Sequence, residues 1–331
     1  MRNVLVIGGS RYFGKILVER LRDAGDRVTV LNRGSAVPPA GVGHVVADRS
    51  DEAALAAALG AAEFDVVLDQ VLYNPADAAV AGRVFTGRAG RYVMTSTMEV
   101  YDPATSAVLP APVPGRPVAE DAVDPAGWKV DEELWRDPAR VAALYDEATA
   151  YAEGKRQAEA VLARGAVALP YAAVRSAHVV GGGAQDFTGR LAHYVERIAQ
   201  GRPVVVHSDP YETSFVGHRD VAAFLHAVAG SDAVGPVNAC MTAPLSVLDL
   251  AVLVGERVGR APVFAAPGEV PGEVPGEEVS PYSFDRYYAM DNRRAEALWG
   301  AAVGRGAAAR FGRTVDTLAE AVDAAAREAG Y

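Results

Sequence analysis

The hydrophobic pattern of this chain alternates between two periods in its first half. Short apolar runs typical of buried strands occupy residues 3–7, 27–31, 43–46, 65–69, 91–95 and 171–175. Segments with the apolar spacing of amphipathic helices lie between them, at residues 13–24, 51–60, 75–86 and 145–164. Strands and helices that alternate in this way form a parallel sheet covered by helices on both faces. The pattern therefore predicts a doubly wound α/β fold, with ligands at the carboxyl ends of the strands.

The pattern becomes mixed after residue 176 and predicts a second, smaller unit. A helix is expected near 186–200, strands at 203–206 and 236–239, and helices at 246–258, 291–300 and 314–328. We accordingly divide the chain into a sheet domain, residues 1–176, and a mixed α/β substrate domain, residues 177–331, with a strand near 235–240 returning to the sheet. The tandem Pro-Gly-Glu repeat at 267–277 cannot form a packed core, and we interpret it as a mobile loop.

The first strand leads directly into a glycine-rich turn. The turn consists of Gly8, Gly9, Ser10, Arg11, Tyr12, Phe13 and Gly14, and a helical segment follows it. A buried strand, a tight turn and a helix N-terminus together make a cradle for a pyrophosphate, as in the Rossmann fold. We expect these seven residues to bind a dinucleotide. The alternative is an ordinary strand-to-helix turn of another α/β protein.

The residues after the second strand bear on the choice of nucleotide. NAD-binding proteins usually carry an acidic residue there, which accepts a hydrogen bond from the ribose 2′-OH. This chain has Asn32 and Arg33 instead, and Arg11 stands in the glycine turn where a glycine is usual. Two guanidinium groups match the oxygens of a 2′-phosphate, so NADP(H) is favoured over NAD(H), whose ribose Asn32 could bond. Asp48, after the third strand, is a candidate adenine contact, with a turn or helix cap as the alternative.

Composition narrows the classes of partner. The 331 residues carry a net charge of −10, which disfavours binding to nucleic acid and to anionic membrane surfaces. There is no apolar run of about 18 residues that could span a membrane, and the single cysteine, Cys240, cannot form an internal disulfide. The histidines lack metal-ligand spacing, so we expect no metal. A small-molecule substrate and a cytoplasmic location are expected.

Two further motifs carry candidate chemistry. Ser96 and Thr97 stand at the end of the fifth predicted strand, and Tyr151 and Lys155 lie four residues apart in a helical segment. That spacing places the phenol and the ammonium on one face of the helix. The segment between them, 102–144, is rich in proline and acidic residues, and we interpret it either as a cover over the site or as a surface insertion.

Together with the glycine turn, these motifs resemble the extended or atypical short-chain dehydrogenase/reductases, the NAD-dependent epimerase/dehydratase group. The resemblance extends to Val174–Gly181, where Ser176 replaces a usual proline, and to Phe215–Ala222 before a helix. The arginine within the glycine turn is similar to a subgroup with the pattern Gly-Gly-Thr-Arg-Phe-x-Gly. That subgroup includes sugar-nucleotide-like enzymes and chloroplast RNA-associated proteins.

The resemblance implies roles for three residues. Tyr151 would exchange a proton with the substrate hydroxyl. Lys155, together with an oxidised nicotinamide ring, would lower the pKa of Tyr151, and it would also bond the nicotinamide ribose. Thr97 would hold the substrate oxygen, although a strand-end hydroxyl more often bonds the backbone. The resemblance also implies a homodimer formed through the helix at 145–164, which carries Ala152, Ala158 and Leu162.

The candidate substrate contacts are Tyr73, Glu99, His178, Arg190 and His218. Glu99 would serve as an additional acid or base in epimerase or dehydratase chemistry, and simple surface exposure is its alternative. His178 takes the place of a residue that contacts substrate in the resembling enzymes, and a purely structural histidine is its alternative.

Three functions follow from these residues. The first is an NAD(P)-dependent oxidoreductase that acts on a secondary alcohol or ketone of a sugar, a sugar nucleotide or a secondary metabolite. The second is a redox-neutral epimerase or dehydratase that keeps NAD tightly bound. The third is a noncatalytic nucleotide- or RNA-binding protein, against which the intact Tyr151 and Lys155 and the net charge of −10 argue.

Overall fold

The chain builds a central seven-stranded parallel sheet. The computed structural model describes residues 1–165, 169–183, 186–270, 279–303 and 314–331. The strands are β1 (Asn3–Ile7), β2 (Arg27–Asn32), β3 (Gly43–Val46), β4 (Val66–Asp69), β5 (Tyr92–Thr97), β6 (Tyr171–Ser176) and β10 (Gly235–Ala239). Their order is β10-β6-β5-β4-β1-β2-β3, and every pair is parallel, so the carboxyl ends meet at one edge. The doubly wound Rossmann fold expected from the apolar runs is confirmed.

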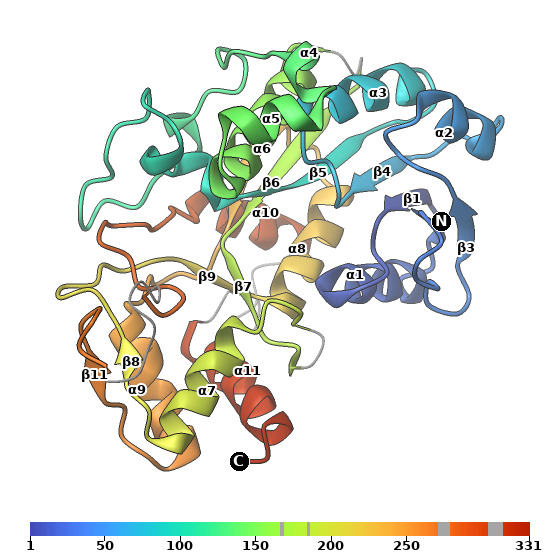
Figure 1. Ribbon diagram of the computed structural model, residues 1–331. Coiled ribbons are helices and arrows are strands. Elements are labelled where there is room, and N and C mark those ends of the chain that lie inside the picture. The colour runs from blue at the N-terminus through green and yellow to red at the C-terminus, as the bar shows by residue number, and fades with distance from the viewer. Residues whose placement is uncertain (166–168, 184–185, 271–278, 304–313) are drawn as a thin grey trace.

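Helices cover both faces of this sheet (Figure 1). On one face α1 (Tyr12–Asp23) packs beside α8 (His218–Ala229), and both contribute to one apolar core. On the other face α2 (Glu52–Leu59), α3 (Pro75–Phe85) and α6 (Glu147–Ala163) enclose a second core. Strands buried on both faces read as continuous apolar runs, which is why their bounds were predicted closely. The end of β5 differs from the prediction. The strand extends to Thr97 instead of ending at residue 95, because it pairs with β6 as far as Ser176.

The residues after β6 build a separate apolar core below the sheet (Figure 1). Three helices, α7 (Arg190–Gln200), α9 (Val247–Val258) and α11 (Thr314–Glu328), surround it. Two short parallel pairs complete this part, β7 (His178–Val180) with β9 (Phe215–Gly217) and β8 (Val204–Val205) with β11 (Phe264–Ala265). The chain returns to the sheet through β10, against which α10 (Arg293–Val303) packs. Most of the repeat at 267–277 lies outside the described residues.

The insertion between β5 and α6 packs against the helices of the sheet domain. It contains the short helices η1 (Met98–Tyr101), η2 (Pro103–Thr105), η3 (Glu120–Ala122), α4 (Glu132–Trp135) and α5 (Pro138–Leu144). Of these, α4 contacts α3, and α5 contacts α6. The α6 residues Ala152, Ala158 and Leu162 are buried within the chain itself, with exposed fractions of 0%, 0% and 2%. These three residues are therefore not available to a second subunit, whereas Tyr151 of the same helix is 39% exposed. A homodimer through this helix stays a prediction.

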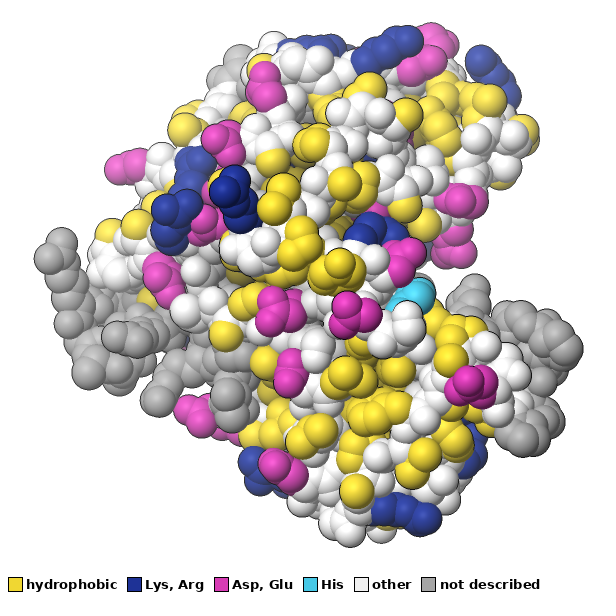
Figure 2. All heavy atoms as spheres, turned by 90° about the vertical axis from the view of Figure 1, so that its left-hand side faces the viewer, with side chains coloured by type: hydrophobic (Ala, Val, Ile, Leu, Met, Phe, Trp, Pro, Cys, Tyr) yellow, Lys and Arg dark blue, Asp and Glu magenta, His cyan; other side chains and the backbone are white. Residues whose placement is uncertain are grey.

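The surface drawn in Figure 2 carries acidic and basic side chains interspersed with apolar ones, without a continuous basic area. Within the described part of the chain, no helix combines the length and the apolar character needed to cross a membrane. The described residues also contain no cluster of three or more His, Cys, Asp or Glu side chains that could hold a metal ion.

Candidate active site

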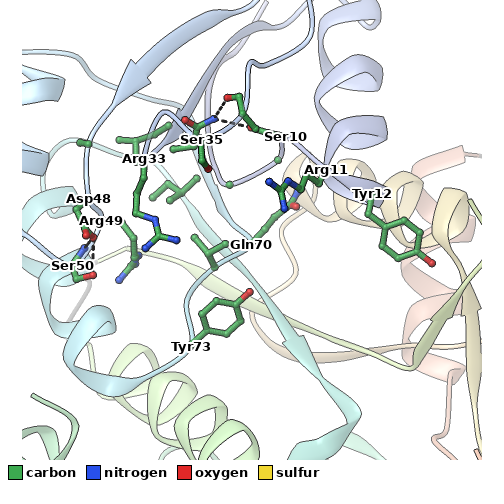
Figure 3. A pocket seen from close by; sticks show the side chains of 18 of the residues that line it. Ser10, Arg11, Tyr12, Arg33, Ser35, Asp48, Arg49, Ser50, Gln70 and Tyr73 are labelled. Carbon is green, nitrogen blue, oxygen red and sulfur yellow. Dashed lines mark hydrogen bonds between the residues drawn. The ribbon is translucent and has the colours of Figure 1, made fainter. Parts of the chain in front are cut away.

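A cleft of about 540 Å³ begins at the glycine turn and runs along the carboxyl edge of the sheet (Figure 3). Gly8 and Gly9 there have φ angles of +90° and +76°, which side-chain-bearing residues rarely adopt. A Cβ on Gly9 would also lie 2.8 Å from a methyl carbon of Val6. At Gly14, a Cβ would collide with the side-chain amide of Gln70. Both backbone conformation and close packing therefore require glycine in this turn.

The first turn of α1 presents unpaired backbone donors beside the cleft. Arg11 occupies the N-cap position with an extended backbone and makes no capping hydrogen bond through its side chain. The N–H groups of the first helical turn have no partner within the helix, and the helix dipole is positive there. Ser10, Arg11 and Tyr12 line the cleft at this point. These residues fit the pyrophosphate of a dinucleotide.

Arg11 and Arg33 reach into the cleft from the glycine turn and from the end of β2 (Figure 3). Both residues are exposed, and within the described ranges neither forms an ion pair with a carboxylate. Asp48 lines the same cleft, and its carboxylate accepts hydrogen bonds from the amide and hydroxyl of Ser50 at 2.9 and 2.8 Å. These bonds, and then the charge of Arg33, lower the pKa of Asp48. The cleft thus offers two uncompensated guanidinium groups and one ionised carboxylate.

Asn32 holds the turn that carries Arg33. Its amide nitrogen donates to the hydroxyl of Ser10 at 2.8 Å and to the carbonyl of Ala36 at 2.9 Å. Its amide oxygen accepts from the backbone of Gly34 at 2.8 Å and lies 3.0 Å from a ring nitrogen of His44. Both donors and both acceptor positions of the amide are therefore engaged. In this arrangement Asn32 has no free group for a ribose hydroxyl, and its contribution to the cleft is to orient its neighbours.

A third arginine, not singled out in the sequence, forms part of the cleft floor. Arg49 is 7% exposed and lies between Asp69 at the end of β4, 2.6 Å away, and Asp77 in α3, 3.5 Å away. Asp69 is fully buried and also accepts a hydrogen bond from the Tyr92 hydroxyl at 2.6 Å. Nε and Nη1 of Arg49 are buried without a hydrogen-bond partner among the described residues, as is the amide nitrogen of Gln70. The cleft therefore has unsatisfied donors in its wall, which fits a site for a polar ligand.

Tyr151 and Thr97 come together at the carboxyl end of β5. The Thr97 hydroxyl accepts a hydrogen bond from the backbone of Glu99 at 3.2 Å, which is the capping role expected of a strand-end hydroxyl. Thr97 also lies close to Tyr151, which is 39% exposed. Burial raises the pKa of Tyr151 to about 12, and the nearby Thr97 hydroxyl opposes that rise. The phenol is consequently protonated at neutral pH.

Lys155 lies behind Tyr151 and is almost completely buried. Its ammonium donates to the carbonyl oxygen of Thr95 at 2.8 Å and lies 4.5 Å from the centre of the Tyr73 ring and 5.9 Å from that of Tyr151. Burial lowers the pKa of Lys155 to about 8. Since Lys155 is not among the groups that shift the pKa of Tyr151, the protein alone does not show the lowering of that pKa that the resemblance implies.

Glu99 lies on the substrate side of Tyr151. Its carboxylate accepts a hydrogen bond from the Tyr288 hydroxyl at 2.8 Å, and burial raises its pKa although that bond opposes the rise. The alternative that Glu99 is simply a surface residue is therefore wrong. Arg190, at the first position of α7, acts electrostatically on both Glu99 and Tyr151. These contacts bring two predicted substrate residues, Glu99 and Arg190, close to Tyr151.

The two histidine candidates are placed differently. His178 is 7% exposed and stacks on Phe284 at 5.5 Å, and burial lowers its pKa to about 3, so the ring is neutral. It belongs to an aromatic cluster that also contains Tyr288, the partner of Glu99. His218 instead stacks on Tyr12 at 5.9 Å and lines a separate cavity between α1, α8 and α11. In Figure 3 Tyr12 points away from the other labelled side chains.

Comparison with known proteins finds one family model and one relative with a similar sequence over part of the chain. Residues 4–113 match the model of the NAD dependent epimerase/dehydratase family. The chain is 33% identical over 123 residues to a 2′-dehydrokanamycin reductase of Streptomyces kanamyceticus. That similarity covers 37% of this chain and 35% of the relative, so it spans about a third of the relative's length.

Solved structures are similar over the whole chain. The structure of the Bordetella bronchiseptica enzyme WbmH in complex with NAD⁺ has a TM-score of 0.65 at 19% identity. The similarity covers 100% of this chain and 100% of WbmH. A UDP-glucose 4-epimerase from Thermus thermophilus, in complex with NAD, has a TM-score of 0.65 at 20% identity, covering 98% of this chain and 99% of its own. At these identities the likeness shows the fold.

Proposed function

We propose, from the match of residues 4–113 to the NAD dependent epimerase/dehydratase family, that this chain is an NADP(H)-dependent oxidoreductase. Its substrate would be a ketone or secondary alcohol in a sugar, a sugar nucleotide or a secondary metabolite. The observation that carries the proposal is that Tyr151, Thr97 and Lys155 come together beside Tyr73, which lines the cleft that begins at the glycine turn.

The nucleotide would lie along the cleft with its pyrophosphate at the glycine turn. Arg11 and Arg33 carry positive charge without a carboxylate partner among the described residues, and a 2′-phosphate would supply the missing anion. Since Asn32 has no free acceptor for a 2′-hydroxyl, this wall of the cleft suits NADP(H) better than NAD(H). Lys155, together with the Tyr73 side of the cleft, would lie at the nicotinamide end. When bound, the nicotinamide exchanges a hydride with the substrate carbon.

The residues of the chain would handle the substrate oxygen and its proton. Thr97 and Tyr151 would both bond this oxygen, because the Thr97 hydroxyl lies close enough to the phenol to affect its pKa. A phenol whose pKa is raised to about 12 holds its proton at neutral pH and can deliver it to the oxygen of a ketone as that ketone is reduced. This protonation state favours ketone reduction as the forward direction. The name of the Streptomyces relative, a reductase of a 2′-dehydro compound, supports the same direction.

A redox-neutral epimerase or dehydratase is the second candidate, and Glu99 is the observation that favours it. Its buried carboxylate with raised pKa lies near Tyr151, where such chemistry would use a second acid or base. Structural neighbours include a UDP-glucose 4-epimerase in complex with NAD. An enzyme of this kind would retain NAD through purification.

We further propose that residues 1–176, with β10, form the nucleotide-binding domain and residues 177–331 the substrate domain. Arg190 and the aromatic residues around His178 belong to the second part. The substrate would therefore lie between the two parts of the chain, a small molecule and not a nucleic acid, since the net charge is −10.

The test is titration calorimetry of nucleotide-free protein with NADPH and with NADH, preceded by an absorbance spectrum of the protein as purified. We expect selective binding of NADPH, no retained nucleotide, and NADPH consumption with 2′-dehydrokanamycin or a related keto-sugar. Retained NAD together with conversion of UDP-glucose would establish the redox-neutral alternative. If neither nucleotide binds, the noncatalytic interpretation replaces both.

A further inference from the structure

Tyr73 is placed against the ammonium of Lys155, a contact that its predicted role at the substrate does not explain. It lies between β4 and α3, lines the cleft and is 47% exposed. The centre of its ring is 4.5 Å from Nζ of Lys155 and 6.3 Å from the centre of the Tyr151 ring. In Figure 3 its ring projects into the cleft from the side opposite Arg11. One face of an aromatic ring thus stands over a buried cation.

The segment that carries Tyr73 is fixed at both ends. Arg49 pairs with Asp69 before it and with Asp77 after it. Asn74 caps α3 by accepting the amide of Asp77 at 2.9 Å. The position of the ring is therefore set by the fold and does not depend on a mobile loop.

Close packing on α6 completes this support. Gly154 of α6 lies directly under Tyr73, because a Cβ at that position would collide with the Tyr73 carbonyl oxygen and would lie 2.9 Å from the ring of Trp135. The residue before Lys155 in α6 is thus a glycine at the point where the backbone of Tyr73 contacts the helix. Trp135 belongs to α4 of the insertion, so α4 also packs against α6 at Gly154.

Lys155 is short of partners for its charge. The ammonium has three donors, it is 2% exposed, and the Thr95 carbonyl at 2.8 Å is its hydrogen-bond acceptor among the described residues. Burial of a charge with few partners is unfavourable, and it lowers the pKa of Lys155 to about 8. The charged or titratable groups around it are Asp69 of β4, Glu159 and Tyr151 of α6, Arg49 after β3, and Tyr73 itself. The ring of Tyr73 supplies a negative face where a second acceptor is missing.

We propose that Tyr73 is a positioning residue whose ring face holds the Lys155 ammonium in its charged form beside Tyr151. The ring acts through its π face, and the hydroxyl is not needed. A cation–π contact with a desolvated ammonium is stronger than one at an exposed site, because water does not compete for the cation. The effect on catalysis rests on the proposed function, in which a charged Lys155 would bond the nucleotide ribose and lower the pKa of Tyr151.

The experiment measures the titration of Lys155 directly in the nucleotide-free protein. The chain has three lysines, Lys15, Lys129 and Lys155, and the first two are exposed. In protein labelled with ¹³Cε-lysine, NMR therefore gives three signals, and Lys15→Arg and Lys129→Arg assign them. The Tyr73→Leu variant removes the ring, and Tyr73→Phe is the matched control that keeps it.

We expect the Lys155 titration midpoint to fall by roughly half a pH unit or more in Tyr73→Leu and to stay unchanged in Tyr73→Phe. Circular dichroism reports that each variant is folded, the exposed Lys15 and Lys129 serve as titration references, and Tyr73→Met replaces Tyr73→Leu if the latter does not fold. An unchanged or raised midpoint without the ring overturns the proposal, and so does an equal fall in Tyr73→Phe.

A second measurement separates this proposal from the proposed function. In calorimetry, we expect NADPH to bind Tyr73→Leu nearly as tightly as Tyr73→Phe at neutral pH and up to about threefold more weakly above about pH 8, where less Lys155 is charged without the ring. If NADPH binds neither variant nor the unaltered protein, the proposed function fails. The NMR titration then decides the role of Tyr73 by itself, because it needs no nucleotide.

Discussion

The two ends of the cleft are built differently. At the adenosine end, Arg11 and Arg33 are exposed and, among the described residues, have no carboxylate partner. At the catalytic end, Thr97 and Lys155 are buried and already bonded inside the protein. The first end leaves its charge for a ligand to neutralise, whereas the second holds its groups in place before any ligand arrives. The difference implies that affinity and turnover are determined by separate residues.

The buried arginines show the same contrast. Arg156 of α6 is 1% exposed and donates to the carbonyls of Val100 at 2.8 Å, Glu99 at 3.1 Å and Asp102 at 3.2 Å. It ties the segment that carries Glu99 to the helix that carries Tyr151. Arg49, in the cleft floor, keeps donors without partners among the described residues. Arg156 thus has partners for its donors behind the catalytic candidates, whereas Arg49 in the floor of the cleft lacks them among the described residues.

The largest effect is expected at Tyr151. Tyr151→Phe removes the proton donor and should reduce kcat by about 10²- to 10⁴-fold, which is the usual contribution of general acid catalysis. The dissociation constant for NADPH should stay within about twofold, because the phenol does not belong to the charged end of the cleft. Steady-state kinetics and calorimetry on the same preparation test this. A parallel loss of affinity would mean that the two ends are not separate.

The reverse result is expected at the arginines. Arg33→Ala and Arg11→Ala should each weaken NADPH binding by about 10-fold or more and leave NADH binding nearly unchanged, because a charged hydrogen bond to phosphate contributes roughly 1.5–3 kcal/mol. Arg27→Ala, an exposed arginine at the other end of β2, is the matched control. Calorimetry at two salt concentrations should show the loss shrinking at high salt. Equal losses for NADPH and NADH would contradict a 2′-phosphate site.

A pH-dependent gain in stability is expected when Lys155 is replaced. The buried Lys155 has a pKa of about 8, whereas the unfolded side chain titrates near 10.4. Below about pH 8 the amine is charged in both states, so the full cost of burying the charge is present. Lys155→Met should therefore raise the free energy of unfolding at pH 7 by about 2 kcal/mol.

This gain should vanish as the pH rises. Between about pH 8 and 10.4 Lys155 is neutral in the folded protein but still charged in the unfolded chain. The free energy of unfolding of the unaltered protein therefore rises toward that of Lys155→Met. Urea unfolding at several pH values measures it, with Lys15→Met at an exposed site as the control. A gain that does not depend on pH would show that packing, and not charge, is responsible.

The smallest effect is expected at Glu99. Glu99→Gln should leave NADPH binding unchanged and lower kcat by about tenfold, because the amide keeps the bond from Tyr288 and loses only the titratable proton. Glu63→Gln, an exposed position away from the cleft, is the control. An unchanged kcat removes Glu99 from the mechanism and with it the observation that favours the redox-neutral alternative.

The sequence predicted the elements of the sheet closely because their signal is local. The apolar runs at β1, β2 and β3 match the observed strands to within one residue, and the glycine turn follows β1 as expected. Tyr151 and Lys155 could also be placed on one helix from their spacing alone. The short pairs β7–β9 and β8–β11 were not predicted as pairs, since strands of two or three residues carry almost no periodic signal.

What the sequence determined by itself was the order of strands and helices, the position of the glycine turn with Arg11, and the presence of Arg33 after β2. Those features depend on residues that are neighbours along the chain. Only the tertiary structure decided that the amide of Asn32 is fully engaged, that Arg49 is buried between Asp69 and Asp77, and that the ring of Tyr73 covers Lys155. The ion pairs, the ring contact and the bonds of Asn32 to Ser10 and His44 join segments well separated in sequence, and their geometry exists only when the sheet edge brings those segments together.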